Sequence, residues 1–215
     1  MGAVWALIVA LGMAAPAAAT PSQVGITTAA IGTAWLLLEP DLDRQGLEWA
    51  QTTSAAEGPG VPGRTAMEAI SFLGDGRFAV PALLLLAARD PEGASLAATA
   101  FANAGLTVVA LKVLAGRERP WVPGSSGQFT GWNLSSDHHS FPSGHAATSF
   151  ALATVLSDRY PEWRVALWTA AALVAFSRVA LGHHWPSDVL AGAALGMVVG
   201  QAILEQRYNF VSIRF

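Results

Sequence analysis

Apolar segments rich in alanine and leucine recur along most of the chain and are separated by short polar stretches. Beyond the amino terminus they cover residues 78–88, 94–115, 145–156, 165–181 and 189–204. Little of this sequence alternates apolar and polar residues as a half-buried strand would, and Ala and Leu favour helices. The pattern therefore predicts an all-α protein in which each segment forms one helix of a bundle.

The lengths of these segments bear on whether the bundle is embedded in a membrane. A helix needs ~20 apolar residues to cross a bilayer, and only some segments approach that length. Segments 78–88 and 145–156 are short unless flanking residues extend them, so buried core helices are the alternative. Arginines near alternate helix ends predict a cytoplasmic side and six spans with both termini inside: Arg89, Arg159, Arg164, Arg207 and Arg214.

The amino terminus carries a further apolar run at residues 4–13, followed by small residues at 14–20. Small residues after such a run suit a signal peptidase, which predicts export. However, no Lys or Arg precedes Trp5, and a second apolar run at 25–38 follows at once. Residues 1–20 are therefore predicted to be a signal peptide or an uncleaved N-terminal anchor.

Three polar stretches mark connections between the predicted helices. They are a Gly/Pro-rich stretch at 57–64, a turn at 74–76 and a long Gly/Ser-rich loop at 120–140. No linker or internal repeat divides the 215 residues, so one domain is predicted. If the arginine-bearing ends are cytoplasmic, the protein lies in an inner membrane and the loops that carry the polar motifs face the periplasm. A soluble periplasmic protein, released by signal cleavage, is the alternative.

Composition narrows the class of protein further. Hydrophobic residues make up 53% of the chain and charged residues only 13%, which favours a membrane or cell-envelope protein. The net charge is −3 and the few basic residues form no run, so nucleic acid is not a predicted partner. Because the chain has no cysteine, disulfides, thiolate metal sites and cysteine nucleophiles are excluded.

The first polar island near a helix end contains Lys112 and the pair Arg119-Pro120. Lys112 and Arg119 are seven residues apart, about two helical turns, so both project from one face if the helix continues through Gly116. Two cations would then face one cavity. The alternative is a lysine that snorkels at a helix end beside a solvated arginine.

The second island, Pro142-Ser143-Gly144-His145, opens a predicted apolar helix. Ser143 is a plausible N-cap, and the free N–H groups and positive dipole end of such a helix accept an anion readily. Gly144 lets a ligand oxygen approach the backbone, and His145 is placed to donate a proton beside it. Ordinary helix capping is the alternative interpretation.

The third island contains Ser177-Arg178, His184 and Asp188. His184 and Asp188 are four residues apart, and Pro186 favours a helix start between them, so the carboxylate can reach the imidazole. Such a pair fixes a tautomer and strengthens a nucleophile. The guanidinium of Arg178 suits phosphate, although a structural ion pair between Arg178 and Asp188 is the alternative.

Together, the order Lys-x6-Arg-Pro, then Pro-Ser-Gly-His, then Ser-Arg-x5-His-x3-Asp resembles the type 2 phosphatidic acid phosphatase and vanadium haloperoxidase superfamily. All three motifs match without a departure, and the resemblance covers about residues 74–204. It implies a helical bundle with a phosphatase catalytic core at 74–204. Residues 21–73 would then form an N-terminal helical region and 205–215 a C-terminal tail.

The resemblance also implies roles for individual residues. His184 would be the nucleophile that forms a phosphohistidine, His145 the acid for the leaving oxygen, and Asp188 the residue that orients His184. The remaining motif residues would bind phosphate without a metal or cofactor: Lys112, Arg119, Ser143, Gly144 and Arg178. A protonated His145 beside a neutral His184 requires that their pKa values shift in opposite directions.

The predicted substrates are phosphate monoesters or diphosphates, and the hydrophobic chain favours lipids such as phosphatidate, phosphatidylglycerophosphate or a polyprenyl diphosphate. A soluble non-specific acid phosphatase and a vanadium-dependent haloperoxidase are the alternatives within this superfamily. A zinc site at the His138-His139 and His183-His184 pairs is disfavoured, because adjacent helical residues point about 100° apart. A non-enzymatic membrane scaffold is a further alternative, but it requires that the polar positions match all three motifs by coincidence.

Overall fold

The computed structural model describes residues 21–55 and 63–212, and within them every regular element is helical. The predicted signal peptide or anchor at residues 1–20 lies outside the described residues. The α-helices are α2 (Pro21–Leu38), α3 (Pro40–Ala55), α4 (Arg64–Leu73), α5 (Gly76–Ala87), α6 (Pro91–Ala115), α7 (Gly144–Arg159), α8 (Arg164–Ala180) and α9 (Pro186–Ser212). The all-α prediction is confirmed, and α9 continues past residue 204, where a tail was expected to begin.

Residues 21–73 were expected to form an N-terminal helical region, but no apolar run marked α3 or α4 individually. Helix α3 is less apolar than the other described helices. The buried positions on α3 recur at helical spacing and form one stripe: Asp43, Leu47, Ala50 and Ser54. A polar residue therefore faces the core from the first turn of this helix. Long apolar runs mark membrane or core helices well, but an amphipathic helix with a buried aspartate lacks that signal.

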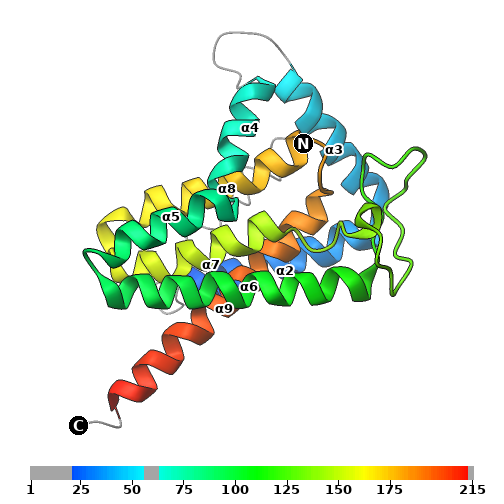
Figure 1. Cartoon of the computed structure of the whole chain (residues 1–215). Helices are drawn as coiled ribbons and strands as arrows, with labels where there is room; N and C mark the ends of the chain where they lie inside the picture. The colour runs from blue at the N-terminus through cyan, green and yellow to red at the C-terminus, as the bar shows by residue number, and fades with distance from the viewer. Residues whose placement is uncertain (1–20, 56–62, 213–215) are drawn as a thin grey trace.

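Helix α7 lies in the middle of the bundle and packs against α6, α8 and α9 (Figure 1). Ten of its 16 residues are buried, and most of them are Ala, Ser or Thr. Small side chains let neighbouring helices approach closely, which fixes the first turn of α7 relative to the surrounding helix ends.

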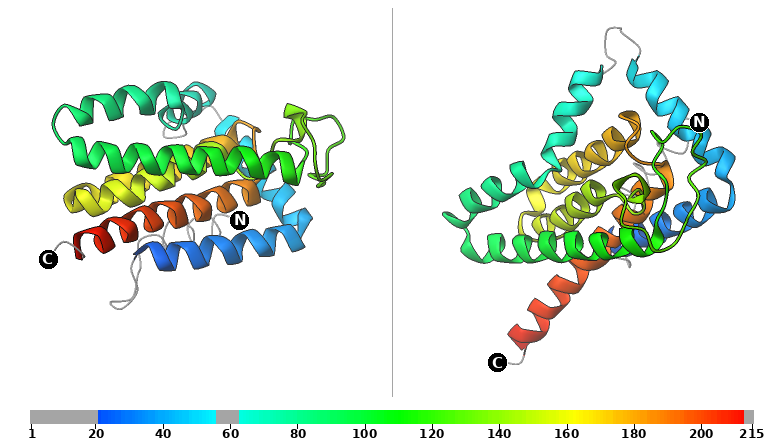
Figure 2. Two further views of the ribbon diagram at one scale, coloured as in Figure 1. Left: turned by 60° about the horizontal axis from the view of Figure 1, so that its bottom comes forward. Right: turned by 45° about the vertical axis from the view of Figure 1, so that its right-hand side comes forward.

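The contact between α7 and α9 depends on three glycines of α9 that recur every four residues, Gly192, Gly196 and Gly200. A Cβ atom at Gly196 would lie 2.1 Å from the carbonyl oxygen of Ala147, and one at Gly192 would lie 2.4 Å from that of Ser143. The two backbones are therefore closer than any other residue type would allow. Figure 2 shows α9 crossing the bundle and continuing beyond it.

An ion-pair cluster ties the start of α6 to the end of α7. Asp90, the N-cap residue of α6, accepts hydrogen bonds from Arg159 Nε at 2.7 Å and from Tyr160 Oη at 2.6 Å. Arg159 also lies 3.6 Å from Glu92. This contact lies at the other end of α6 from the predicted site and holds α6 and α7 in register.

Two helices, α6 and α9, are long and apolar enough to cross a membrane, and α4 with α5 forms a third candidate bent by 46°. Leu106, Val109 and Leu114 of α6 are exposed on the outside of the bundle, as lipid contact would favour. Helices α7 and α8 have only 16 and 17 residues. Length and composition thus support up to three spans among the described residues, and the count of six stays a prediction.

We expect Gly196→Ala to destabilise the protein by about 1–3 kcal/mol, because the added methyl group forces α9 away from α7. Gly105→Ala is the matched control, since its Cβ would meet nothing closer than Thr148 at 4.0 Å. Thermal unfolding in detergent measures the difference. An unfolding temperature for Gly196→Ala equal to that of Gly105→Ala would contradict the close contact.

Candidate active site

The structure brings the three polar islands together at one end of the bundle. Lys112 lies in the last turn of α6, His145 in the first turn of α7 and Arg178 in the last turn of α8. The connection between α8 and α9 carries His184, and Asp188 follows in the first turn of α9. The charges of Arg119, Arg178 and Asp188 all act on Lys112, so these groups share one site.

His184 and Asp188 are both buried, with exposed side-chain fractions of 3% and 0%. Nδ1 of His184 lies 3.5 Å from Oδ2 of Asp188, which is a charge contact longer than a good hydrogen bond. The predicted pairing is present, and Nδ1 is the nitrogen that faces the carboxylate. The other ring nitrogen, Nε2, does not make this contact.

Arg117, which was not among the predicted site residues, is the cation that holds Asp188. Its Nη1 donates to Oδ1 of Asp188 at 2.6 Å, while Ser140 Oγ donates to Oδ2 at 2.5 Å. The backbone N–H of Trp185 also donates to Oδ2, at 2.9 Å. Burial disfavours the charge of Arg117, but Asp188 and Asp43 more than offset it and raise its pKa. The alternative pairing of Asp188 with Arg178 is wrong.

The helix that carries Lys112 does not continue to Arg119, as the shared-face prediction required. It ends at Ala115, and Gly116 adopts a left-handed conformation with φ of 55°, which favours glycine at a helix C-terminus. A Cβ there would also lie 1.8 Å from the carbonyl oxygen of Gly131. The loop, rather than helical periodicity, brings Arg119 back to the site.

Hydrogen bonds to backbone carbonyls position these two cations. Lys112 Nζ donates to the carbonyl oxygens of His139 at 2.5 Å and Ser140 at 3.2 Å. Arg119 Nη1 donates to the carbonyl oxygen of His183 at 2.9 Å. Neither cation has a carboxylate within ion-pair distance among the described residues, so their positive charges are not neutralised by a neighbouring side chain.

Ser143 occupies the predicted N-cap position of α7, but its hydroxyl makes no capping hydrogen bond. Its backbone N–H instead donates to the carbonyl oxygen of Asp188 at 2.9 Å, which ties the start of α7 to α9. The first N–H groups of α7 are therefore not capped by this side chain. Such a terminus attracts an anion.

Arg178 contacts two residues that the sequence did not indicate. Nη1 donates to Ser71 Oγ of α4, and Nη2 contacts Nδ1 of His183. Arg178 Nε, Ser143 Oγ and His184 Nδ1 are buried without a hydrogen-bond partner among the described residues. A buried polar group without a partner costs free energy, and all three groups belong to the predicted site.

His145 and His184 do not show the opposite pKa shifts that were predicted. Burial lowers the pKa of His184 well below its ordinary value, against the effect of Asp188. Burial, and then the charge of Arg178, lower the pKa of His145 to about 4. Burial is the main cause of the shared direction, and nearby cations lower both pKa values further. A bound phosphate group would counter the positive potential of these cations.

The other three histidines lie in loops beside the site. His138 Nδ1 contacts Thr130 Oγ1, and His139 Nε2 contacts the carbonyl oxygen of Asn133. His183 packs edge-on against Trp121. Within residues 21–55 and 63–212, no group of three or more His, Asp or Glu side chains gathers as a set of metal ligands.

A family model described as the PAP2 superfamily matches residues 93–212, more than half of the chain. The chain belongs to the PAP2 superfamily. The resemblance inferred from the three motifs is thus confirmed. In this PAP2 protein, the matched region contains Lys112, Arg119, His145, Arg178 and His184.

Several curated proteins share part of this sequence. A lipid A 1-phosphatase of Porphyromonas gingivalis is 46% identical over 67 residues, which are 29% of this chain and 15% of that protein. One of Rhizobium etli is 38% identical over 94 residues, 43% of this chain and 40% of that protein. An undecaprenyl-diphosphatase of Sulfolobus acidocaldarius is 46% identical over 59 residues, 27% of this chain and 29% of that protein. The chain thus spans less than half the length of these relatives.

Two crystal structures resemble the PAP2 protein over most of their length. LpxE of Aquifex aeolicus has a TM-score of 0.60 and 27% identity, over 74% of this chain and 94% of that chain. A transmembrane PAP2 type phosphatidylglycerolphosphate phosphatase from Bacillus subtilis has a TM-score of 0.63 and 20% identity, over 86% and 96%. The second likeness shows the shared fold alone.

The lowered pKa of His184 makes the stability of this protein depend on pH. The ordinary pKa of a histidine is about 6.5. As pH falls below that value, His184 becomes protonated in the unfolded state but stays neutral in the folded state. Stability should therefore decrease as pH falls from about 7 to about 5. Thermal unfolding at several pH values should show a smaller decrease in His184→Gln; an equal decrease would mean that other groups account for it.

Proposed function

We propose that the protein is a lipid phosphatase that transfers the phosphoryl group to His184 without a metal ion. The observation that carries this proposal is the pairing of buried His184 and Asp188 beside the first turn of α7 and three cations. Lys112, Arg119 and Arg178 are the cations. Phosphate release from a panel of lipid and soluble esters tests the proposal directly.

In the first step, Nε2 of His184 attacks phosphorus and the bond to the leaving oxygen breaks. His145 donates its proton to that oxygen, and the product is an alcohol or a shorter phosphate. In the second step, water attacks the phosphorus of the phosphohistidine, and neutral His145 takes the proton of that water. Inorganic phosphate leaves, and both histidines return to their starting states.

The positive groups of the site stabilise the charge that spreads over the equatorial oxygens of the phosphoryl group. Arg178 Nε and Ser143 Oγ, which are buried and have no hydrogen-bond partner in the described part of the chain, supply donors for these oxygens. The free N–H groups at the start of α7 supply more. Asp188 stabilises the positive charge that His184 acquires during transfer, as triad logic requires.

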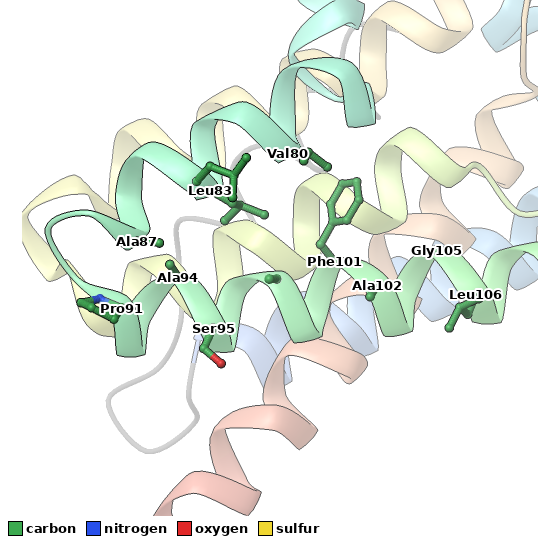
Figure 3. Close-up of a pocket in the computed structure, with 12 residues that line it drawn as sticks. Val80, Leu83, Ala87, Pro91, Ala94, Ser95, Phe101, Ala102, Gly105 and Leu106 are labelled. Atoms are coloured by element: carbon green, nitrogen blue, oxygen red, sulfur yellow. The ribbon is translucent and has the colours of Figure 1, made fainter.

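A groove between α5 and α6 supports a lipid as the substrate (Figure 3). Val80 and Leu83 of α5 face Phe101 of α6 across it, and of the residues that line it only Ser95 has a polar side chain. The groove follows α6 toward its last turns, where Lys112 lies. We propose that it holds an acyl or polyprenyl chain while the phosphate lies among the cations.

The names of the similar proteins favour two substrate classes, a lipid A 1-phosphate and a polyprenyl diphosphate.

We also propose that the site faces the periplasm. Arg159, paired with Asp90, lies at the opposite end of α6 and α7, and arginines are enriched on the cytoplasmic side of a membrane. A reporter fused after Phe215 would then remain in the cytoplasm. Activity with short soluble esters alone would contradict the lipid substrate.

We expect phosphatase activity to survive excess chelator and to be inhibited by vanadate. The cations stabilise the negative charge of the phosphoryl oxygens, as a metal ion would otherwise do, and vanadate adopts the geometry of the phosphoryl transition state. Initial rates with and without chelator provide the measurement, and a protein fully exchanged into metal-free buffer is the control. Activity that disappears on chelation and returns with zinc or magnesium would contradict this mechanism.

Substitution of the two histidines should have different consequences. His184→Ala should abolish turnover of every ester because no nucleophile remains. His145→Ala should lose about a hundredfold or more with an alkyl phosphate but far less with an activated aryl phosphate, whose leaving oxygen needs no proton. Steady-state rates with both esters measure the difference, and His139→Ala in the loop is the control.

Rapid-quench labelling with a phosphorus-labelled substrate tests the covalent step. Acid-labile label should accumulate on the wild-type protein and on His145→Ala, and it should be absent from His184→Ala. Label that persists on His184→Ala would show that another residue is the nucleophile.

A further inference from the structure

Asp43 of α3 reaches the site from a helix that carries none of the three motifs. Its side chain is buried, and it lies in the first turn of α3, on the stripe that faces the core. The family match begins at residue 93 and so does not include it. No group that we place at the phosphate contacts Asp43 directly.

The contacts of Asp43 lead to Asp188 through Arg117 and Ser187. Oδ2 of Asp43 accepts from Arg117 Nη2 at 2.8 Å and from Ser187 Oγ. Oδ1 accepts from the backbone N–H of Ser187 at 2.9 Å. Arg117 Nη1 then donates to Ser187 Oγ and to Asp188 Oδ1, each at 2.6 Å. One guanidinium is therefore shared between two buried carboxylates.

A planar guanidinium held at several nitrogens cannot shift without breaking other contacts. Arg117 Nε donates to the carbonyl oxygen of Gly127 at 3.1 Å, and the guanidinium lies over the rings of Phe129 and Trp185. Asp43 completes this fixation on the side away from Asp188. The negative charge of Asp43 also offsets part of the positive charge of Arg117. The negative charge of Asp188 is then less neutralised by Arg117 and stabilises a charged imidazole at His184 better.

We propose that Asp43 is a positioning residue for the nucleophile: by holding Arg117 and Ser187, it fixes Asp188 against His184. This inference rests on the proposed function, because it assigns His184 the attacking role. Every acceptor oxygen of Asp43 faces a donor, which suits an ionised carboxylate. Burial raises the pKa of Asp43, while Arg117 and Ser187 oppose that shift.

The test compares Asp43→Asn with Asp41→Asn, an exposed aspartate of the same helix. Asp43→Asn should lower kcat about tenfold, because Asp188 and His184 lose their alignment. KM and the inhibition constant for inorganic phosphate should change less than about twofold, since the phosphate-binding cations are untouched and this product binds without the attack by His184. Asp41→Asn should match the wild type in all three quantities.

A double-mutant cycle separates positioning from a general structural role. If Asp43 acts through Asp188, then Asp43→Asn should lower kcat less than about twofold when Asp188→Asn is already present. An equal tenfold loss in both backgrounds would overturn the proposal, as would an Asp43→Asn variant whose kcat equals that of the wild type. Parallel weakening of inorganic phosphate binding and kcat would also overturn it.

Folding and the proposed function are controlled separately. If Asp43→Asn does not fold, Ser187→Ala removes the hydroxyl that joins Arg117 to Asp43, and the same loss of kcat and the same dependence on Asp188 are expected. An additive loss there overturns the proposal. A wild-type protein that releases no phosphate from any ester refutes the proposed function and this inference with it, whereas an active wild type equal to Asp43→Asn refutes the inference alone.

Discussion

The complete burial of the Asp188 carboxylate is the constraint on which the arrangement of the site depends. A buried charge is tolerated only when cations and hydrogen-bond donors surround it, and Asp188 receives these from Arg117, Ser140 and the backbone of Trp185. Its own carbonyl oxygen accepts from the backbone of Ser143. The loop after α6, the turn before α9 and the first turn of α7 are therefore fixed around one residue.

The positive groups of the site are treated in two different ways. Arg117 has its charge offset by two carboxylates and is enclosed by aromatic rings. Lys112 and Arg119 instead donate to backbone carbonyls and have no carboxylate within ion-pair distance among the described residues. The first arrangement builds structure, and the second prepares a site for an anion, since a dianionic phosphate group gains most from cations that no side chain neutralises.

Close helix packing fixes the positions of the site residues relative to one another. The glycines of α9 and the small residues of α7 bring two backbones into contact, so the start of α7 and the start of α9 cannot move independently. At the far end, Asp90 and Arg159 hold α6 to α7. The positions of His145 and His184 thus follow from a rigid scaffold, as precise chemistry requires.

The sequence by itself determined the helical class, six of the described helices and the motif residues, because long apolar runs and fixed spacings are local signals. Tertiary structure alone decided which residue pairs with Asp188, since Arg117 and Asp188 are 71 positions apart and no periodicity relates them. It also decided that Gly116 ends α6 and that a loop returns Arg119. Hydrogen bonds and buried charges between distant segments are settled only when those segments pack together.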